Sequence, residues 1–242
     1  MSVSKKYWDE KAKIYDKFDG KLTETQLNFL QLIQNFGINF KDKNVIDIGC
    51  GTGNFTLHIA KICRSILGVD SSEGMLSKLY SKLAKTSLTN VRTELVSFQD
   101  FIPKEKFDIA FLTMSGAVNE NEFEKFLNLA EQRVYMSWEK PRYSSMLAPF
   151  FLHIGKKRDE KTTAVKFMEF LQTNNIAFKT EVREDIKVIK REFSEAFTNA
   201  SWHLNMDKSK FDENELKRYL ETICKDNVIT DEITSTTRTL VF

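Results

Sequence analysis

The amino-acid sequence predicts an α/β protein with a doubly wound, mostly parallel sheet. Three segments of strand length support this prediction, and they cover residues 45–48, 65–70 and 107–114. Their continuous apolar runs are typical of parallel strands, which are buried on both faces. Amphipathic helical patterns alternate with these segments along the chain. This alternation is typical of a sheet that is covered by helices on both faces.

A glycine-rich turn follows the first of these strands. Residues 47–53 are Asp-Ile-Gly-Cys-Gly-Thr-Gly, and a helical pattern comes next. Glycine is needed where the backbone takes a positive φ or where a ligand approaches the main chain. The N–H groups that open the next helix are unpaired and carry partial positive charge. Asp70 ends the second strand about 20 residues after Gly49, the separation at which an acid meets a ribose hydroxyl. These features predict a site for a ribosyl ligand.

The glycine spacing distinguishes between ribosyl ligands. A dinucleotide fingerprint is G-x-G-x-x-G, whereas this turn is G-x-G-x-G and has Asp47 two residues before its first glycine. A carboxylate there disfavours a pyrophosphate and suits a ligand with an ammonium and a sulfonium group. Residues 47–53, with Asp-Ser-Ser-Glu-Gly-Met at 70–75, resemble the class I S-adenosylmethionine (SAM)-dependent methyltransferases. A nicotinamide dinucleotide site and a glycine turn without a ligand are the alternatives.

The resemblance covers the first half of the chain well and the rest in outline. It implies a seven-stranded Rossmann-like sheet with an antiparallel last strand, in a single domain over residues 1–242. Within it, residues 1–40 would form N-terminal lid helices and residues 41–190 the cofactor-binding core. A small helical insertion over residues 191–228 would precede the last strand at residues 229–242.

Two helical patterns precede the first strand. The first covers residues 7–18, and the second, an amphipathic one, covers residues 23–36. One face of the first helix carries residues three or four positions apart: Trp8, Ala12, Tyr15 and Phe18. In small-molecule members of the family a similar helix closes over the cofactor, which implies lid roles for Trp8 and Tyr15. The alternative is a terminal helix that packs an aromatic face on the core.

The later elements follow from the same periodicities. Helices are expected at residues 75–83, 120–130, 162–174, 193–203 and 212–224, and strands at residues 91–96, 134–138, 178–189 and 236–242. Residues 141–149 are expected to form a loop.

The resemblance also implies which residues hold the cofactor. Met75 would lie beneath the adenine, and Met114 would lie near the reactive methyl group. Family members often place an Asp after the third strand for the adenine amino group. Ser97 occupies that place here, so either Ser97 or Asp100 would serve, while the Phe98 N–H would meet the adenine ring. The implied site comprises Trp8, Tyr15, Asp47, Gly49, Gly51, Asp70, Ser71, Met75, Ser97, Phe98 and Met114.

No catalytic residue is predicted. Methyl transfer from a sulfonium is a displacement at carbon, so the protein mainly aligns the reactants and excludes water. A general base is needed only if the acceptor is protonated. An Asn-Pro-Pro-Tyr motif for amide or exocyclic nitrogen is absent, and so is a Pro-Cys nucleophile. Trp202 and His203 would either line an acceptor pocket or end a helix.

Composition restricts the partners. The 242 residues include 36 basic and 34 acidic ones without a long like-charge run, so a nucleic-acid acceptor is not expected. The three cysteines lack metal-ligand spacing, which predicts reduced thiols, no metal and a cytoplasmic protein. Neither a secretory signal nor an apolar span of about 18 residues is found, so no membrane association is expected.

The sequence thus predicts SAM-dependent methyl transfer to an oxygen or nitrogen atom of a small molecule. One alternative is methylation of an RNA base, for which residues 156–158 are the only basic cluster. Another is a SAM-binding regulatory protein without turnover. The altered motif at Ser97 and the missing Gly-Gly turn before the fifth strand keep that alternative open. The acceptor and the oligomeric state do not follow from the sequence.

Overall fold

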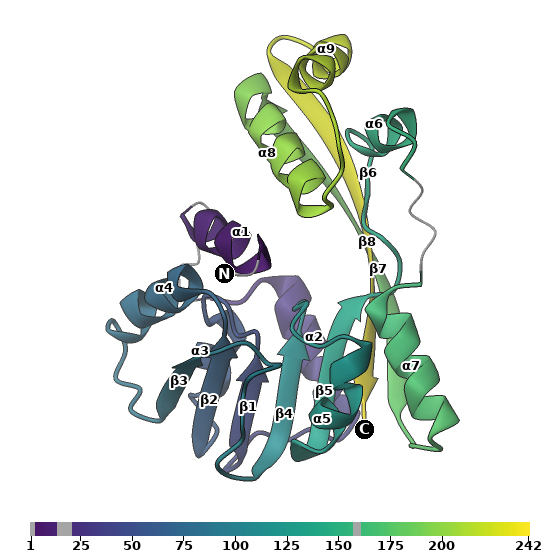
Figure 1. The fold of residues 1–242 in the computed structure, drawn as a ribbon. Helices are drawn as coiled ribbons and strands as arrows, with labels where there is room; N and C mark the ends of the chain where they lie inside the picture. Colours follow the sequence, from purple (N-terminus) through teal and green to yellow (C-terminus); the bar gives the residue numbers. More distant parts are fainter. Residues whose placement is uncertain (1–2, 14–20, 157–160) are drawn as a thin grey trace. The chain divides into compact units, whose positions relative to one another are not determined.

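The computed structural model describes residues 3–13, 21–156 and 161–242, which form an α/β fold (Figure 1). The strands are β1 (Asn44–Ile48), β2 (Ser65–Asp70), β3 (Val91–Leu95), β4 (Phe107–Thr113), β5 (Ala130–Trp138), β6 (Tyr143–Ser144), β7 (Lys179–Glu192) and β8 (Val228–Val241). The helices are α1 (Val3–Ala12), α2 (Glu24–Asn35), α3 (Asn54–Ile59), α4 (Glu73–Leu83), the 3-10 turn η1 (Glu120–Glu122), α5 (Phe123–Leu127), α6 (Ala148–His153), α7 (Thr163–Thr173), α8 (Phe193–Met206) and α9 (Glu213–Ile223).

The strands form one sheet in the order β3-β2-β1-β4-β5-β8-β6, with β7 paired to β8. Among β1 to β5, each pair of neighbouring strands is parallel. Strand β8 is antiparallel to β6, and Arg133 of β5 exchanges both backbone hydrogen bonds with Phe242, as in an antiparallel pair. The predicted doubly wound, mostly parallel sheet with an antiparallel last strand is confirmed. The described residues contain eight strands, because the short β6 joins the seven expected ones.

Two helical layers cover the parallel strands. Ile46 and Ile48 of β1 belong to a buried cluster that includes Phe126 of α5 and Phe167 of α7. Val45 belongs to a second buried cluster that includes residues of α2 and α3. Successive residues of a strand point to opposite faces, so this division places the helices on both sides of the sheet.

Some elements differ in extent from the sequence prediction. The helix expected at residues 120–130 is shorter, because β5 already begins at Ala130, which pairs with Phe107 of β4. The first helix begins at Val3, earlier than expected, and residues 14–18 of the expected segment, with Tyr15, lie outside the described residues. The loop expected at residues 141–149 contains β6 and the start of α6.

Strands β7 and β8 are longer than expected because they pair with each other over a polar stretch. The chain divides into two compact units. The first comprises Met1–Ser137, Thr163–Glu181 and Arg238–Phe242, and the second comprises Trp138–Thr162 and Val182–Thr237. The single domain and the internal boundaries expected from the sequence stay a prediction. None of the described helices has the length and apolar character that a membrane crossing requires.

The second unit has its own core around a buried carboxylate. Apolar residues of α6, α8 and α9 pack together with Ile229 of β8. Asp231 of β8 is 2% exposed and accepts hydrogen bonds from Ser144 Oγ (2.7 Å) and Met146 N (3.1 Å). Its other oxygen lies 3.3 Å from Arg191 Nη1 of β7. Asp231 of β8 therefore contacts both β7 and the segment that runs from β6 to α6.

Replacing Asp231 by Ala should destabilise the protein. The change leaves the largely buried Arg191 guanidinium without its carboxylate, and breaking such a pair costs about 3–5 kcal/mol. Urea unfolding monitored by circular dichroism measures the loss. The control is Glu232→Ala at the exposed neighbouring position, which should change the free energy of unfolding by less than about 0.5 kcal/mol. Equal effects of the two substitutions would contradict the role of Asp231.

Candidate functional site

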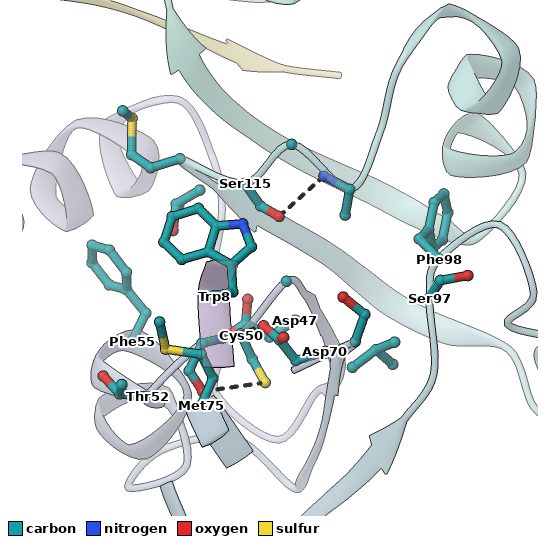
Figure 2. A pocket seen from close by; sticks show the side chains of 18 of the residues that line it. Trp8, Asp47, Cys50, Thr52, Phe55, Asp70, Met75, Ser97, Phe98 and Ser115 are labelled. Atoms are coloured by element: carbon teal, nitrogen blue, oxygen red, sulfur yellow. Dashed lines mark hydrogen bonds between the residues drawn. The ribbon is translucent and has the colours of Figure 1, made fainter. Parts of the chain in front are cut away.

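A cavity of about 460 Å³ lies at the carboxyl ends of β1, β2 and β4 in the first unit (Figure 2). The strand order reverses between β1 and β4, and open α/β sheets bind ligands at such a switch point. All the described residues of the predicted site line this cavity: Trp8, Asp47, Gly49, Gly51, Asp70, Ser71, Met75, Ser97, Phe98 and Met114. The predicted Tyr15 lies outside the described residues.

The glycine turn forms the floor of the cavity between β1 and α3. Gly49 has a φ of 66°, and a Cβ atom there would lie 1.9 Å from Ser115 Oγ. Gly49 therefore lets the loop after β4 approach the turn. Gly51 has a φ of 55°, and a Cβ atom there would meet nothing within 4 Å. Glycine is thus required at position 51 by the backbone conformation, and the space beside it is open to a ligand.

Asp70 at the end of β2 holds the turn in place. Its Oδ2 accepts a hydrogen bond from Gly51 N (2.8 Å), and its Oδ1 accepts one from Ser72 N (2.8 Å). Burial raises the pKa of Asp70, and these two backbone bonds oppose that effect. A carboxylate has about four acceptor positions, so further acceptor capacity remains. Asp70 can therefore bind hydroxyl groups in the cavity while it keeps both backbone bonds.

Asp47 places a second carboxylate in the same cavity. It is 3% exposed, and Thr56 Oγ1 of α3 donates a hydrogen bond of 2.6 Å to its Oδ2. Burial raises the pKa of Asp47 to about 7; the hydrogen bond from Thr56 lowers it, and the negative charge of Asp70 raises it further. Two carboxylates that repel each other in a cavity are stabilised by a nearby positive charge. The cavity therefore favours a cationic ligand.

The segment after β3 lines another part of the cavity. Ser97 Oγ donates a hydrogen bond of 2.6 Å to Asp100 Oδ2, and Asp100 is an exposed residue that is not among those lining the cavity. Of the two candidates at this position, Ser97 is the one that faces the cavity. The Phe98 carbonyl accepts a hydrogen bond from Lys125 Nζ (2.6 Å), which fixes this segment against α5.

Helix α1 contributes Trp8 to the cavity and is tied to α4 by the adjacent residue, Asp9. Asp9 Oδ1 accepts hydrogen bonds from Ser72 Oγ (2.6 Å) and Gly74 N (3.0 Å) at the start of α4. A Cβ atom at Gly74 would lie 3.1 Å from Ala12 Cβ, so the glycine allows the two helices to approach closely. Sequence reasoning missed Asp9. The Ser-x-Gly pattern at the start of α4 was the available signal.

Gln26 and Phe55 were not predicted from the sequence. Gln26 reaches the cavity from α2, and Phe55 lies just after the glycine turn. The loop after β4 supplies Ser115, whose Oγ accepts a hydrogen bond from Ala117 N (3.2 Å). Met114 has a φ of 52°, a left-handed conformation that a non-glycine residue adopts only where its surroundings impose it.

The lining offers little for nucleophilic catalysis. Cys50 lines the cavity, but burial and the charges of Asp47 and Asp70 raise the pKa of its thiol well above the usual value, which disfavours the nucleophilic thiolate. His58, His153 and His203 are all described, and none is among the lining residues. Within the described ranges, no group of His, Cys, Asp and Glu could hold a metal ion.

Comparisons with known sequences agree with this geometry. A family model described as a methyltransferase domain matches residues 45–134. The chain is 30% identical over 93 residues to a protein of Methanocaldococcus jannaschii named Probable cobalt-precorrin-6B C(15)-methyltransferase (decarboxylating), and the match covers 38% of this chain and 48% of that protein. It is 24% identical over 136 residues to a 23S rRNA (uracil(1939)-C(5))-methyltransferase of Photobacterium angustum, covering 50% of this chain and 62% of that protein. The chain thus spans about half to three fifths of the length of these relatives.

Solved structures share the fold. The YcgJ protein of Bacillus subtilis matches with a TM-score of 0.55 at 13% identity, over 89% of this chain and 98% of that protein. Magnesium protoporphyrin IX methyltransferase from Synechocystis PCC 6803 matches with a TM-score of 0.55 at 12% identity, over 98% of this chain and 97% of that protein. The glycine turn, the two acids and the matching domain model lie in the same stretch of sequence. Residues 45–134 therefore match a methyltransferase domain, and the chain shares its fold with solved methyltransferases.

Proposed function

We propose that the cavity binds SAM and that the protein transfers a methyl group to an oxygen or nitrogen atom of a small molecule. The observation that carries the proposal is the pair of carboxylates, Asp47 and Asp70, on either side of the glycine turn in one cavity. A dinucleotide would bring a pyrophosphate to this turn, where two carboxylates would repel it. A ligand with an ammonium, a sulfonium and a ribose suits the same groups.

The residues present fit this cofactor. Asp70 would hold the ribose hydroxyls, and the open space beside Gly51 would admit the cofactor next to the main chain. Ser97 and Phe98 would hold the adenine, with Met75 packed against it, and Ser71 would lie beside the ribose. Asp47 would balance the positive charge. When bound, SAM supplies a methyl group on a sulfonium, which is a good leaving group.

The remaining task of the chain is to orient the acceptor and exclude water. Trp8 would cover the cavity from α1, and Met114 and Ser115 would border the methyl group from the loop after β4. The raised pKa of the Cys50 thiol disfavours the covalent route in which a cysteine nucleophile activates a carbon acceptor. The solved neighbour that methylates magnesium protoporphyrin IX supports a small-molecule acceptor.

Two alternatives remain for experiment. Some relatives are named as rRNA methyltransferases, but the basic cluster at residues 156–158 that an RNA acceptor would use lies mostly outside the described residues. A SAM-binding protein without turnover would bind the cofactor without converting it. Incubation with labelled SAM and a pool of small metabolites distinguishes the two cases. An enzyme releases S-adenosylhomocysteine, whereas a binding protein without turnover does not.

Ligand titration tests the cofactor. SAM and S-adenosylhomocysteine should raise the melting temperature, because a ligand that binds only the folded state stabilises it by mass action. At a concentration of 100 times Kd the gain is about 2.7 kcal/mol. NAD at the same concentration should leave the melting temperature unchanged. A calorimetric titration that shows binding of NAD and none of SAM would overturn the proposal.

Replacement of Asp70 by Asn should weaken SAM binding. The amide keeps one acceptor oxygen but loses the charge and the second acceptor, so the loss should be about 1.5–3 kcal/mol, as for a hydrogen bond to a charged group. Isothermal titration calorimetry measures the affinity. Asp42→Asn is the matched control, because Asp42 is exposed in the turn before β1 and does not line the cavity, and its affinity should stay within about twofold of wild type, or about 0.4 kcal/mol. Unchanged SAM affinity in the Asp70→Asn variant would mean that Asp70 only holds the glycine turn and does not bind the ligand.

SAM affinity should depend on pH through Asp47. Its pKa of about 7 means that the carboxyl is mostly protonated at pH 6, whereas a cation binds the deprotonated form better. Affinity should therefore rise between pH 6 and pH 8, by up to about tenfold per pH unit below the pKa. Binding at pH 6 should release a proton, which calorimetry in buffers of different ionisation enthalpy detects. Asp47→Asn should flatten this profile, and a profile identical to wild type would exclude Asp47.

Helix α1 should act as a lid held by Asp9. Asp9→Ala removes the acceptor for Ser72 and Gly74, so SAM affinity should fall at least tenfold, about 1.4 kcal/mol, because Trp8 is no longer held over the cavity. The melting temperature without ligand should change little. Glu10→Ala, at the exposed neighbouring position, is the control and should bind normally. If both variants bind SAM equally well, or if Asp9→Ala unfolds the protein, α1 is ordinary structure and not a lid.

A further inference from the structure

Strand β7 presents an unusual edge in the second unit. Its sheet partner is β8, and its other edge makes no backbone hydrogen bond to any residue that the structure describes. The strand is 14 residues long, and three large apolar side chains on one of its faces are exposed: Val182 (46%), Ile186 (58%) and Val188 (62%). Long edges of this kind pair readily with another strand, and proteins usually blunt them.

The charges on β7 suggest which strand it would pair with. On the opposite face, Asp185 Oδ2 and Lys187 Nζ form an ion pair of 3.1 Å along the strand. These two residues flank Ile186 symmetrically. In a two-fold antiparallel pair one residue faces its own copy, and residues equally distant from it face each other. A pair centred on Ile186 therefore brings each Asp185 opposite the Lys187 of the other copy.

Other centres are less favourable. A pair centred on Glu184, Asp185 or Lys187 would place like charges directly opposite each other, which destabilises a strand pair. Centring on Val188 would place Glu184 opposite Glu192. It would also oppose Asp185 with Arg191, which is already bound to the buried Asp231. Centring on Val182 would also oppose Glu181 with Arg183, but only residues 179–185 of β7 could then pair. The Ile186 register pairs residues 180–192 and combines an apolar contact at the centre with opposite charges on both sides.

We propose that the protein forms a homodimer in which the β7 edges of two copies pair antiparallel about Ile186. The interface joins the two sheets into one continuous sheet. A single strand pair buries less area than a standard interface of about 1,600 Å², so the dimer should dissociate in the micromolar range. This inference concerns the second unit and does not depend on the cofactor.

Cysteine cross-linking tests the register in the full chain. In a Cys224→Ser background, Ile186→Cys should form a disulfide-linked dimer under mild oxidation, because position 186 faces its own copy. Val182→Cys is the control: it is exposed on the same face, but it would lie about 27 Å from its own copy at about 3.4 Å per residue. Non-reducing gels should show a dimer for the first variant and monomer for the second.

Charge exchange tests the same register without cysteine. Asp185→Lys and Lys187→Asp should each raise the dimer dissociation constant by roughly tenfold, and the double variant should restore it, because the opposite charges are then merely exchanged. Sedimentation velocity over a range of concentrations measures the constant, and circular dichroism confirms folding. A wild-type protein that stays monomeric at high micromolar concentration overturns the proposal. So does equal cross-linking at positions 186 and 182, or a double variant no better than the single ones.

Discussion

The site depends on the carboxylate of Asp70, which hydrogen-bonds two backbone segments. Asp70 accepts a hydrogen bond from Gly51 in the turn after β1 and another from Ser72 at the start of α4. Removing the acceptor would leave two N–H groups at the cavity without partners, and such groups are costly when buried. The same carboxylate keeps acceptor capacity toward the cavity. The Asp70 side chain therefore both holds the backbone around the cavity and offers acceptors to a ligand.

The other parts of the site are fitted around that turn. Ser115 lies so close to Gly49 that no side chain could be accommodated at position 49, and this contact brings the loop after β4 beside the loop after β1. Asp9 bonds to the start of α4 next to Ser72, so α1 is held by the same segment that Asp70 fixes. The cavity thus combines the loops after β1, β2, β3 and β4 with residues of α1 to α4, and its two acids give it a preference for cations.

Much of the fold and the centre of the site could be predicted from local sequence. The apolar runs gave the parallel strands, and the G-x-G-x-G turn with Asp47 and Asp70 located the cavity. Contacts that form only in the folded chain could not be predicted in this way. From helices before β1, Gln26 reaches the cavity and Asp9 reaches the start of α4, and no periodicity shows which helix packs against α4. The length of β7 and β8 was underestimated because a polar ribbon lacks the apolar alternation that marks a half-buried strand.

A crystal structure of the protein with S-adenosylhomocysteine would test the account most directly. The account predicts both ribose hydroxyls within hydrogen-bonding distance of Asp70, with the bonds from Gly51 and Ser72 retained, and the ligand's ammonium on the side of Asp47. A ligand bound elsewhere, or an Asp70 carboxylate turned away from the ribose, would contradict it.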